Sequence, residues 1–307
     1  MYTPQRLSTA VQLPLRHMHY HVRTWGQPQP GVAPLVLVHG WMDVGASYQF
    51  VVDAFSQAFY SGRHIIAPDW RGFGHSTPAA PCDHYTFADY LGDLDALLDH
   101  YVPEGQRIDL VGHSMGGNVA MLYGGARPAR IRRLVNLEGF GMPATEPRQA
   151  AQRMGQWLDE LRQLHRGEMA LKTYDSVEAV AQRLRKTNRR LGEDKALWLA
   201  GEWAAADADG RWAILGDAAH KVVNPQLFRV DEVLAFYAAI TAPVLAVEAS
   251  DDSLGQWWKG RFDLAEYHQR LQAVPQCRIA QVADAGHMLH HDQPQAVARL
   301  IEDFCSE

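Results

Sequence analysis

Hydrophobic residues in this chain form two kinds of pattern that follow one another along the sequence. Leu35–Val38 is an uninterrupted apolar run, which is typical of a parallel β-strand covered on both faces. Longer segments, such as 87–101 and 118–126, repeat their apolar residues with helical spacing. Strands are also expected between 8 and 24, where two short ones fit, and at 64–67, 108–111, 134–137, 244–247 and 278–282. The pattern predicts an α/β protein with a mostly parallel eight-stranded sheet and helices on both faces.

The regular alternation stops after the sixth expected strand. The following hundred or so residues are charged, and their apolar residues have helical spacing at 148–165, 177–191 and 194–204. Strand and helix patterns resume at Pro243. We therefore predict a core domain of residues 1–141 and 242–307, with a helical cap, or lid, of residues 142–241 inserted between the sixth and seventh strands.

Composition and charge narrow the class of protein. The chain has 307 residues and is 47% hydrophobic, which is enough for a packed core. Its net charge of -6 gives no reason to expect nucleic acid or an anionic membrane surface as a partner. Three scattered cysteines match neither a disulfide framework nor a metal-ligand spacing. We expect a soluble cytoplasmic protein with no membrane span, no metal and no cofactor.

Ser114 lies in the most informative segment, Gly112-His113-Ser114-Met115-Gly116. An expected strand precedes this segment and an expected helix follows it, which is the context in which Gly-x-Ser-x-Gly forms a nucleophile elbow. Such a turn strains the serine backbone and places its hydroxyl clear of the chain, at the N-terminus of a helix. The sequence therefore predicts Ser114 as a nucleophile.

Three further motifs accompany the serine, in this order along the chain: His39-Gly40-Trp41, Asp69-Trp70-Arg71-Gly72-Phe73-Gly74-His75-Ser76 before it, and Gly286-His287 after it. With these motifs, nearly the whole chain resembles an α/β-hydrolase. The segments 157–161, 184–188 and 286–291 are similar to the serine hydrolase-like branch of that family. The resemblance implies hydrolysis without naming a substrate.

A serine hydroxyl needs a base near neutral pH, and His287 is the candidate because its loop follows the last expected strand. Open α/β sheets place their sites at the carboxyl ends of the strands, where this loop lies beside the elbow. The oxyanion of acyl transfer is usually bound by two backbone N–H groups, here expected from Trp41 and Met115. His290 and His291 are the rival candidates for the base, although we expect them at the surface or around the site.

Two residues compete to be the acid that orients the histidine. In most of the resembled family this carboxylate follows the seventh strand, where Asp252 lies in Glu248-Ala249-Ser250-Asp251-Asp252. The usual glycine is replaced by Ala249, however, and the usual downstream proline is missing. Glu138, at the end of the sixth strand, matches the position used by some haloalkane dehalogenases. Both fit the order serine, acid, histidine, and we favour Asp252.

The nucleophile distinguishes this chain from related enzymes that catalyse other reactions. Haloalkane dehalogenases and epoxide hydrolases attack with an aspartate, whereas this chain has Ser114. We therefore predict a serine hydrolase that cleaves a carboxylic ester or thioester through an acyl-enzyme. The alternatives are a cofactor-free dioxygenase or lyase that uses the same serine and histidine, and a ligand receptor without turnover.

The expected cap should shape the pocket for a small ester or thioester substrate. Met142, Trp157 and Trp257 are the candidate substrate-binding residues. One expected cap helix also carries a basic cluster, which suits either an anionic substrate or a solvated helix face: Arg185, Lys186, Arg189 and Arg190.

Overall fold

A computed structural model describes residues 2–307. Eight strands pair in the order β1-β2-β4-β3-β6-β7-β11-β12, and a two-residue strand, β5, pairs with β2 beside this path. Strands β4, β3, β6, β7, β11 and β12 run parallel, whereas β1 and β2 form an antiparallel edge. Their bounds are β1 Thr9–Leu15, β2 Met18–Trp25, β3 Leu35–Val38, β4 Ile65–Pro68, β5 Thr77–Pro78, β6 Ile108–His113, β7 Ile131–Leu137, β11 Val244–Ala249 and β12 Cys277–Val282. The predicted mostly parallel sheet of eight strands is confirmed.

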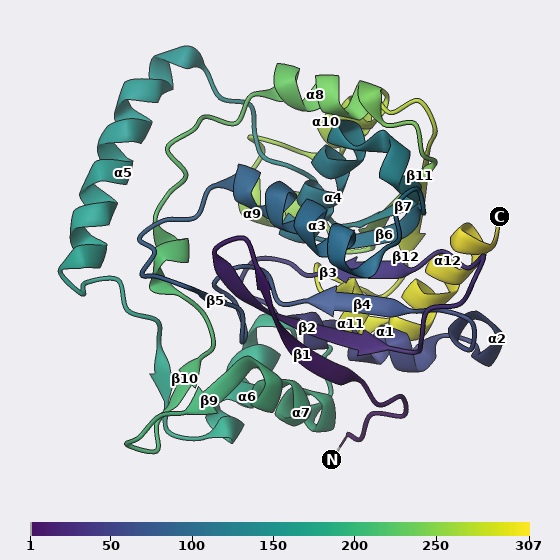
Figure 1. Cartoon of the computed structure of the whole chain (residues 1–307). Helices are drawn as coiled ribbons and strands as arrows, with labels where there is room; N and C mark the ends of the chain where they lie inside the picture. The colour runs from purple at the N-terminus through teal and green to yellow at the C-terminus, as the bar shows by residue number, and fades with distance from the viewer. Residues whose placement is uncertain (1) are drawn as a thin grey trace.

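Helices cover both faces of the sheet, as the sequence predicts (Figure 1). On one face lie α3 Phe87–Tyr101, α4 Met115–Ala126, α8 Val230–Ala239 and α10 Leu264–Leu271. On the other face lie α1 Gln49–Ala54, α2 Gln57–Tyr60, α11 Leu289–Asp292 and α12 Pro294–Ser306. A short helix, α9 Ser253–Trp258, follows β11. The sheet therefore separates two apolar layers, each closed by its own helices.

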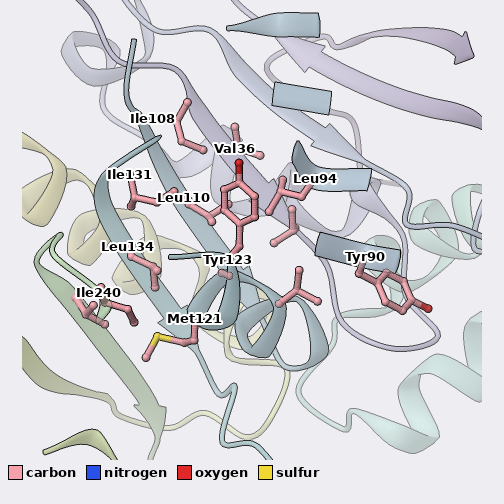
Figure 2. Close-up of a cluster of buried hydrophobic side chains, with 14 of the residues drawn as sticks. Val36, Tyr90, Leu94, Ile108, Leu110, Met121, Tyr123, Ile131, Leu134 and Ile240 are labelled. Carbon is pink, nitrogen blue, oxygen red and sulfur yellow. The ribbon is translucent and has the colours of Figure 1, made fainter. Parts of the chain in front are cut away.

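Figure 2 shows part of the larger apolar layer, between the sheet and helices α3 and α4. Val36 and Leu110 from the central strands are fully buried there, and Leu94 and Met121 meet them from the helices. Burying an aliphatic side chain contributes about 1.5–3 kcal/mol to folding. Because α4 is held in this layer, the residues at its N-terminus have a fixed position relative to the strand ends.

The insertion after β7 contains more than helices. It holds α5 Ala150–His165, α6 Val177–Thr187 and α7 Glu193–Trp203, and also a small sheet of β8 Thr173–Tyr174, β9 Ala204–Ala206 and β10 Trp212–Ile214. Helix α5 stands apart from the sheet in Figure 1, whereas α8 packs on α4, with Val233 and Tyr237 in the main core. In residues 2–307, no helix is long and apolar enough to cross a membrane.

The turn between β6 and α4 is strained and tightly packed. Ser114 has φ 52° and ψ -116°, a conformation that L-residues rarely adopt. A Cβ on Gly116 would overlap the carbonyl oxygens of Val38 and His39, and one on Gly112 would overlap the backbone of Gly116. The glycines are therefore required here because strand, turn and helix approach within backbone contact.

We expect Gly116→Ala to destabilise the protein by about 1–3 kcal/mol or more, because the overlapped atoms belong to the backbone of Val38 and His39 and cannot rotate away. Gly155→Ala is the matched control on α5, since its Cβ would meet no atom of residues 2–307 within 4 Å. Alanine should stabilise that half-buried helical position by about 0.5–1 kcal/mol. Urea unfolding of both variants measures the difference, and equal midpoints would contradict the packing argument.

Candidate active site

Ser114 and His287 are far apart in the sequence but meet at the carboxyl ends of the strands. The Oγ atom of Ser114 lies 2.9 Å from Nε2 of His287. Ser114 follows β6 and caps α4, while His287 lies in the loop between β12 and α11. With Nε2 unprotonated, the imidazole accepts the serine hydrogen bond and can take its proton.

Glu138 occupies the other side of the imidazole. Its Oε2 lies 3.3 Å from Nδ1 of His287, and its Oε1 accepts a 2.7 Å hydrogen bond from the N–H of Ala249. The side chain is almost completely buried, and its backbone has φ 56°, which aims it across the end of β7. Nδ1–H of His287 can therefore donate to a fixed carboxylate.

Asp252, the favoured acid in the sequence analysis, is not beside the histidine in the structure. It is an exposed residue at the N-terminus of α9, where its carboxylate accepts a 2.8 Å hydrogen bond from the N–H of Gly255. This is ordinary helix capping. The geometry therefore corrects the preference between the two candidates: Glu138, not Asp252, faces His287.

Burial shifts the pKa values of Glu138 and His287 in opposite directions. It raises the pKa of Glu138 to about 7, an effect opposed by the N–H of Ala249 and reinforced by the nearby negative charge of Asp252. Burial also lowers the pKa of His287 to about 3, which favours the neutral ring. A neutral imidazole is the form that can act as a base towards Ser114.

The loop after β3 lies directly against the elbow. A Cβ on Gly40 would come within 3.1 Å of Cβ of Ser114. The ring of His39 fixes this loop, because its Nε2 accepts a 2.7 Å hydrogen bond from the N–H of Trp70. Met115 begins α4, where N–H groups have no intrahelical partners. Trp41 and Met115 thus both lie in backbone segments next to the serine.

Three further buried histidines lie behind His287. Nε2–H of His113 donates a 2.8 Å hydrogen bond to the carbonyl of His287, which helps to hold the loop, and no feature of the sequence predicted this bond. His290 and His291 are also buried, and His290 packs on His113, so of their two expected positions the one around the site is found and the surface one is not. The short helix α11 turns their rings inward, against those of Tyr48 and Phe50.

Asp43, His290 and His291 are the residues best placed to hold a metal. Each offers one ligand atom, and these atoms lie within 4.8 Å of one another. Nitrogen and oxygen ligands that share a tetrahedral ion lie about 3.3 Å apart, whereas Nε2 of His290 lies 3.8 Å from Oδ2 of Asp43, so this pair would have to approach to bind one. As it stands, the cluster is a polar part of the core.

The predicted substrate-binding residues separate into two groups. Trp257 packs edge-on against the ring of His287, with centroids 4.2 Å apart, and Met142 lines a cavity of about 400 Å³. Trp157 instead packs against His84 and is not one of the described residues that line the cavity. Its indole lies against His84, whereas Arg153, about one turn earlier on α5, does line the cavity.

The basic cluster of the expected cap helix is partly neutralised. Nη1 of Arg190 lies 2.7 Å from Asp251, and Arg185 pairs with Glu193. Nearby, Asn188 donates a 2.7 Å hydrogen bond to Asp292, whose other oxygen accepts the N–H of Gly286. These contacts join the insertion to the loop that carries His287.

Comparison with known proteins agrees with this architecture. A family model for the alpha/beta hydrolase fold matches residues 33–294. The chain is 24% identical to a serine hydrolase-like protein of Danio rerio over 310 residues, which cover 98% of this chain and 90% of that protein. The chain therefore belongs to the α/β-hydrolase family.

Solved structures share the fold along almost the entire chain. A hypothetical protein of Pseudomonas aeruginosa PAO1 superposes with a TM-score of 0.81 at 25% identity, covering 97% of this chain and 99% of that one. A thioesterase domain from the curacin biosynthetic pathway superposes with a TM-score of 0.78 at 23% identity, covering 96% and 99%. The second similarity concerns the fold alone.

Proposed function

We propose that this protein is a serine hydrolase that cleaves a carboxylic ester or thioester through an acyl-enzyme. The observation that carries the proposal is the 2.9 Å contact between Oγ of Ser114 and Nε2 of His287. A strained elbow that delivers a hydroxyl to an imidazole is of no use to a protein that only binds a ligand. It is the arrangement that nucleophilic catalysis requires.

The proposed reaction has two halves. Oγ of Ser114 attacks the substrate carbonyl carbon while Nε2 of His287 takes the hydroxyl proton. The N–H groups of Trp41 and Met115 stabilise the resulting oxyanion, and His287 returns the proton to the departing alcohol or thiol. Water, deprotonated by His287, then attacks the carbonyl carbon of the acyl-enzyme. The bond between that carbon and Oγ of Ser114 breaks, His287 returns the proton to Oγ, and the carboxylic acid is released.

We assign the orienting acid to Glu138. Its carboxylate is buried and fixed by the N–H of Ala249, so it can hold the Nδ1–H tautomer of His287 and balance the imidazolium that forms transiently. The capping role of Asp252 leaves that residue outside the reaction.

A fluorophosphonate probe tests the proposal most directly, because it reacts with an activated serine. We expect labelling of the folded protein at Ser114, mapped by peptide mass spectrometry, and none in Ser114→Ala. Aryl esters and acyl-CoA thioesters of increasing chain length then distinguish the two substrate classes by their kcat/KM. A folded protein that neither reacts with the probe nor cleaves any of these substrates would contradict the proposal.

A further inference from the structure

A cavity of about 400 Å³ lies against helix α4, whose N-terminus carries Ser114, and its volume is in the range of small-molecule pockets. Most of its wall is apolar, with contributions from α3, α4, α8 and the segment after β7: Phe87, Leu122, Met142, Phe228, Val233 and Phe236. In Figure 1, the start of α5 and helix α8 lie at the same end of the molecule, above α4. The cavity is therefore bounded by both the core and the insertion.

Helix α4 connects the cavity to the nucleophile. Ser114 caps this helix, and Asn118 and Leu122 line the cavity from its next two turns. At 1.5 Å per residue, they lie about 6 Å and about 12 Å along the axis from Ser114. Ser114 and part of the cavity wall therefore belong to the same helix, with the nearest of these wall residues about one turn from the nucleophile.

Helix α9 makes a second connection. Trp257 contacts the ring of His287, and the next residue, Trp258, lines the cavity. Nη1 of Arg270 donates a 2.7 Å hydrogen bond to the carbonyl of Met142 and so fixes the segment that follows β7. The bond from Arg270 therefore holds the part of the cavity wall at Met142.

The charge of the cavity wall is positive. Three arginines line it, Arg153, Arg229 and Arg261, against one acidic residue, Glu232. Arg229 is paired with Asp231, with 2.8 Å between Nη2 and Oδ2. Within residues 2–307, the guanidinium groups of Arg153 and Arg261 form neither an ion pair nor a hydrogen bond, although Arg261 lies over the ring of Trp258.

We propose that this cavity binds the part of the substrate remote from the reacting carbonyl and selects substrates with an apolar body and an anionic group. The inference rests on the proposed hydrolase function and names the substrate class. A carboxylate or phosphate can accept two parallel hydrogen bonds from a guanidinium, which adds geometric selectivity to charge attraction. Arg153 and Arg261 are the donors available for this bond.

Two pairs of substrates test whether the anionic group belongs to the acyl part or to the leaving group of the substrate. On the acyl side, mono-p-nitrophenyl adipate is compared with p-nitrophenyl hexanoate, which ends in a methyl group instead of a carboxylate. On the leaving-group side, hexanoyl-CoA is compared with the hexanoyl thioester of N-acetylcysteamine, which lacks the phosphates. We expect the anionic member of one pair to have a kcat/KM about 10- to 100-fold higher, mainly through a lower KM.

The double variant Arg153→Gln, Arg261→Gln should reduce that preference to within a few-fold of one. Arg166→Gln is the matched control, because Arg166 is exposed at the end of the same helix as Arg153 and lies outside the cavity wall. The control should keep the full preference, and circular dichroism checks that both variants fold.

The outcomes separate this inference from the proposed function. Turnover of the neutral esters with no preference in either pair would overturn the anion selectivity and leave the hydrolase function standing. A preference that survives in the double variant would also overturn it. Absence of both turnover and fluorophosphonate labelling would overturn the two proposals together.

Discussion

Replacing Ser114 with alanine is expected to lower kcat for an aryl ester by roughly 10⁴- to 10⁶-fold, the largest effect of any single substitution in this chain. The variant removes only Oγ, which is the atom that would form the acyl-enzyme. His287→Ala should cause a loss of similar size, because residues that act as a unit are not additive. Steady-state hydrolysis of p-nitrophenyl acetate measures both.

Two controls make these losses interpretable. Ser61→Ala, at an exposed turn after α2, should leave hydrolysis unchanged. Thermal unfolding should show that Ser114→Ala is folded, since alanine fits where serine stands. If Ser114→Ala kept substantial turnover and His287→Ala lost it, the histidine would be acting as a base without a nucleophilic serine. That result would favour the proton-abstraction chemistry considered among the alternatives.

The positions of Ser114 and His287 could be predicted because local sequence determines them. Glycines at 112 and 116 are needed wherever strand, turn and helix backbones meet, and this requirement is visible in the sequence. His287 follows the last strand of a parallel sheet, and all such strands end at the same edge. Chain order and sheet direction were therefore sufficient to predict that the two side chains meet.

Chain order and sheet direction could not decide which carboxylate orients His287. Strands β7 and β11 are neighbours in the sheet, so Glu138 and Asp252 both follow strands that end near His287. What separates them is side-chain direction. The left-handed backbone of Glu138 aims its carboxylate inward, whereas Asp252 begins a helix and bonds to the N–H of Gly255. Neither conformation is determined by residue type or spacing.

The sequence also could not predict the short strands of the insertion or the burial of two polar side chains. Strands β8, β9 and β10 have two or three residues each, too few to show alternation, so the insertion was expected to be helical. His290 and His291 are polar neighbours on a four-residue helix, and only the packing of α11 against Tyr48 and Phe50 shows that both are buried.

Glu138→Gln is expected to lower kcat/KM by about 10³- to 10⁴-fold. Glutamine removes the charge that stabilises the imidazolium, and with its oxygen bound to the N–H of Ala249 it presents an NH2 group where Nδ1–H needs an acceptor. Asp252→Asn should change it by less than about fivefold, since asparagine caps a helix as well as aspartate does. Each substitution converts a carboxylate into its amide, so the two are matched in size and chemistry. Equal losses, or a larger loss in Asp252→Asn, would overturn the assignment of the acid.

The pH dependence provides an independent test of the same residue. Hydrolysis needs Glu138 ionised and His287 neutral, and burial raises the pKa of Glu138 to about 7 while it lowers that of His287. As the pH falls through about 7, the coupled pair gains a proton and kcat/KM should decline. In Glu138→Gln only the imidazole can titrate, and its lowered pKa keeps it neutral. The residual activity should therefore stay level through pH 7 and fall only in more acidic solution. An unchanged profile in Glu138→Gln would assign the decline to another group, because a residue that no longer titrates cannot set it.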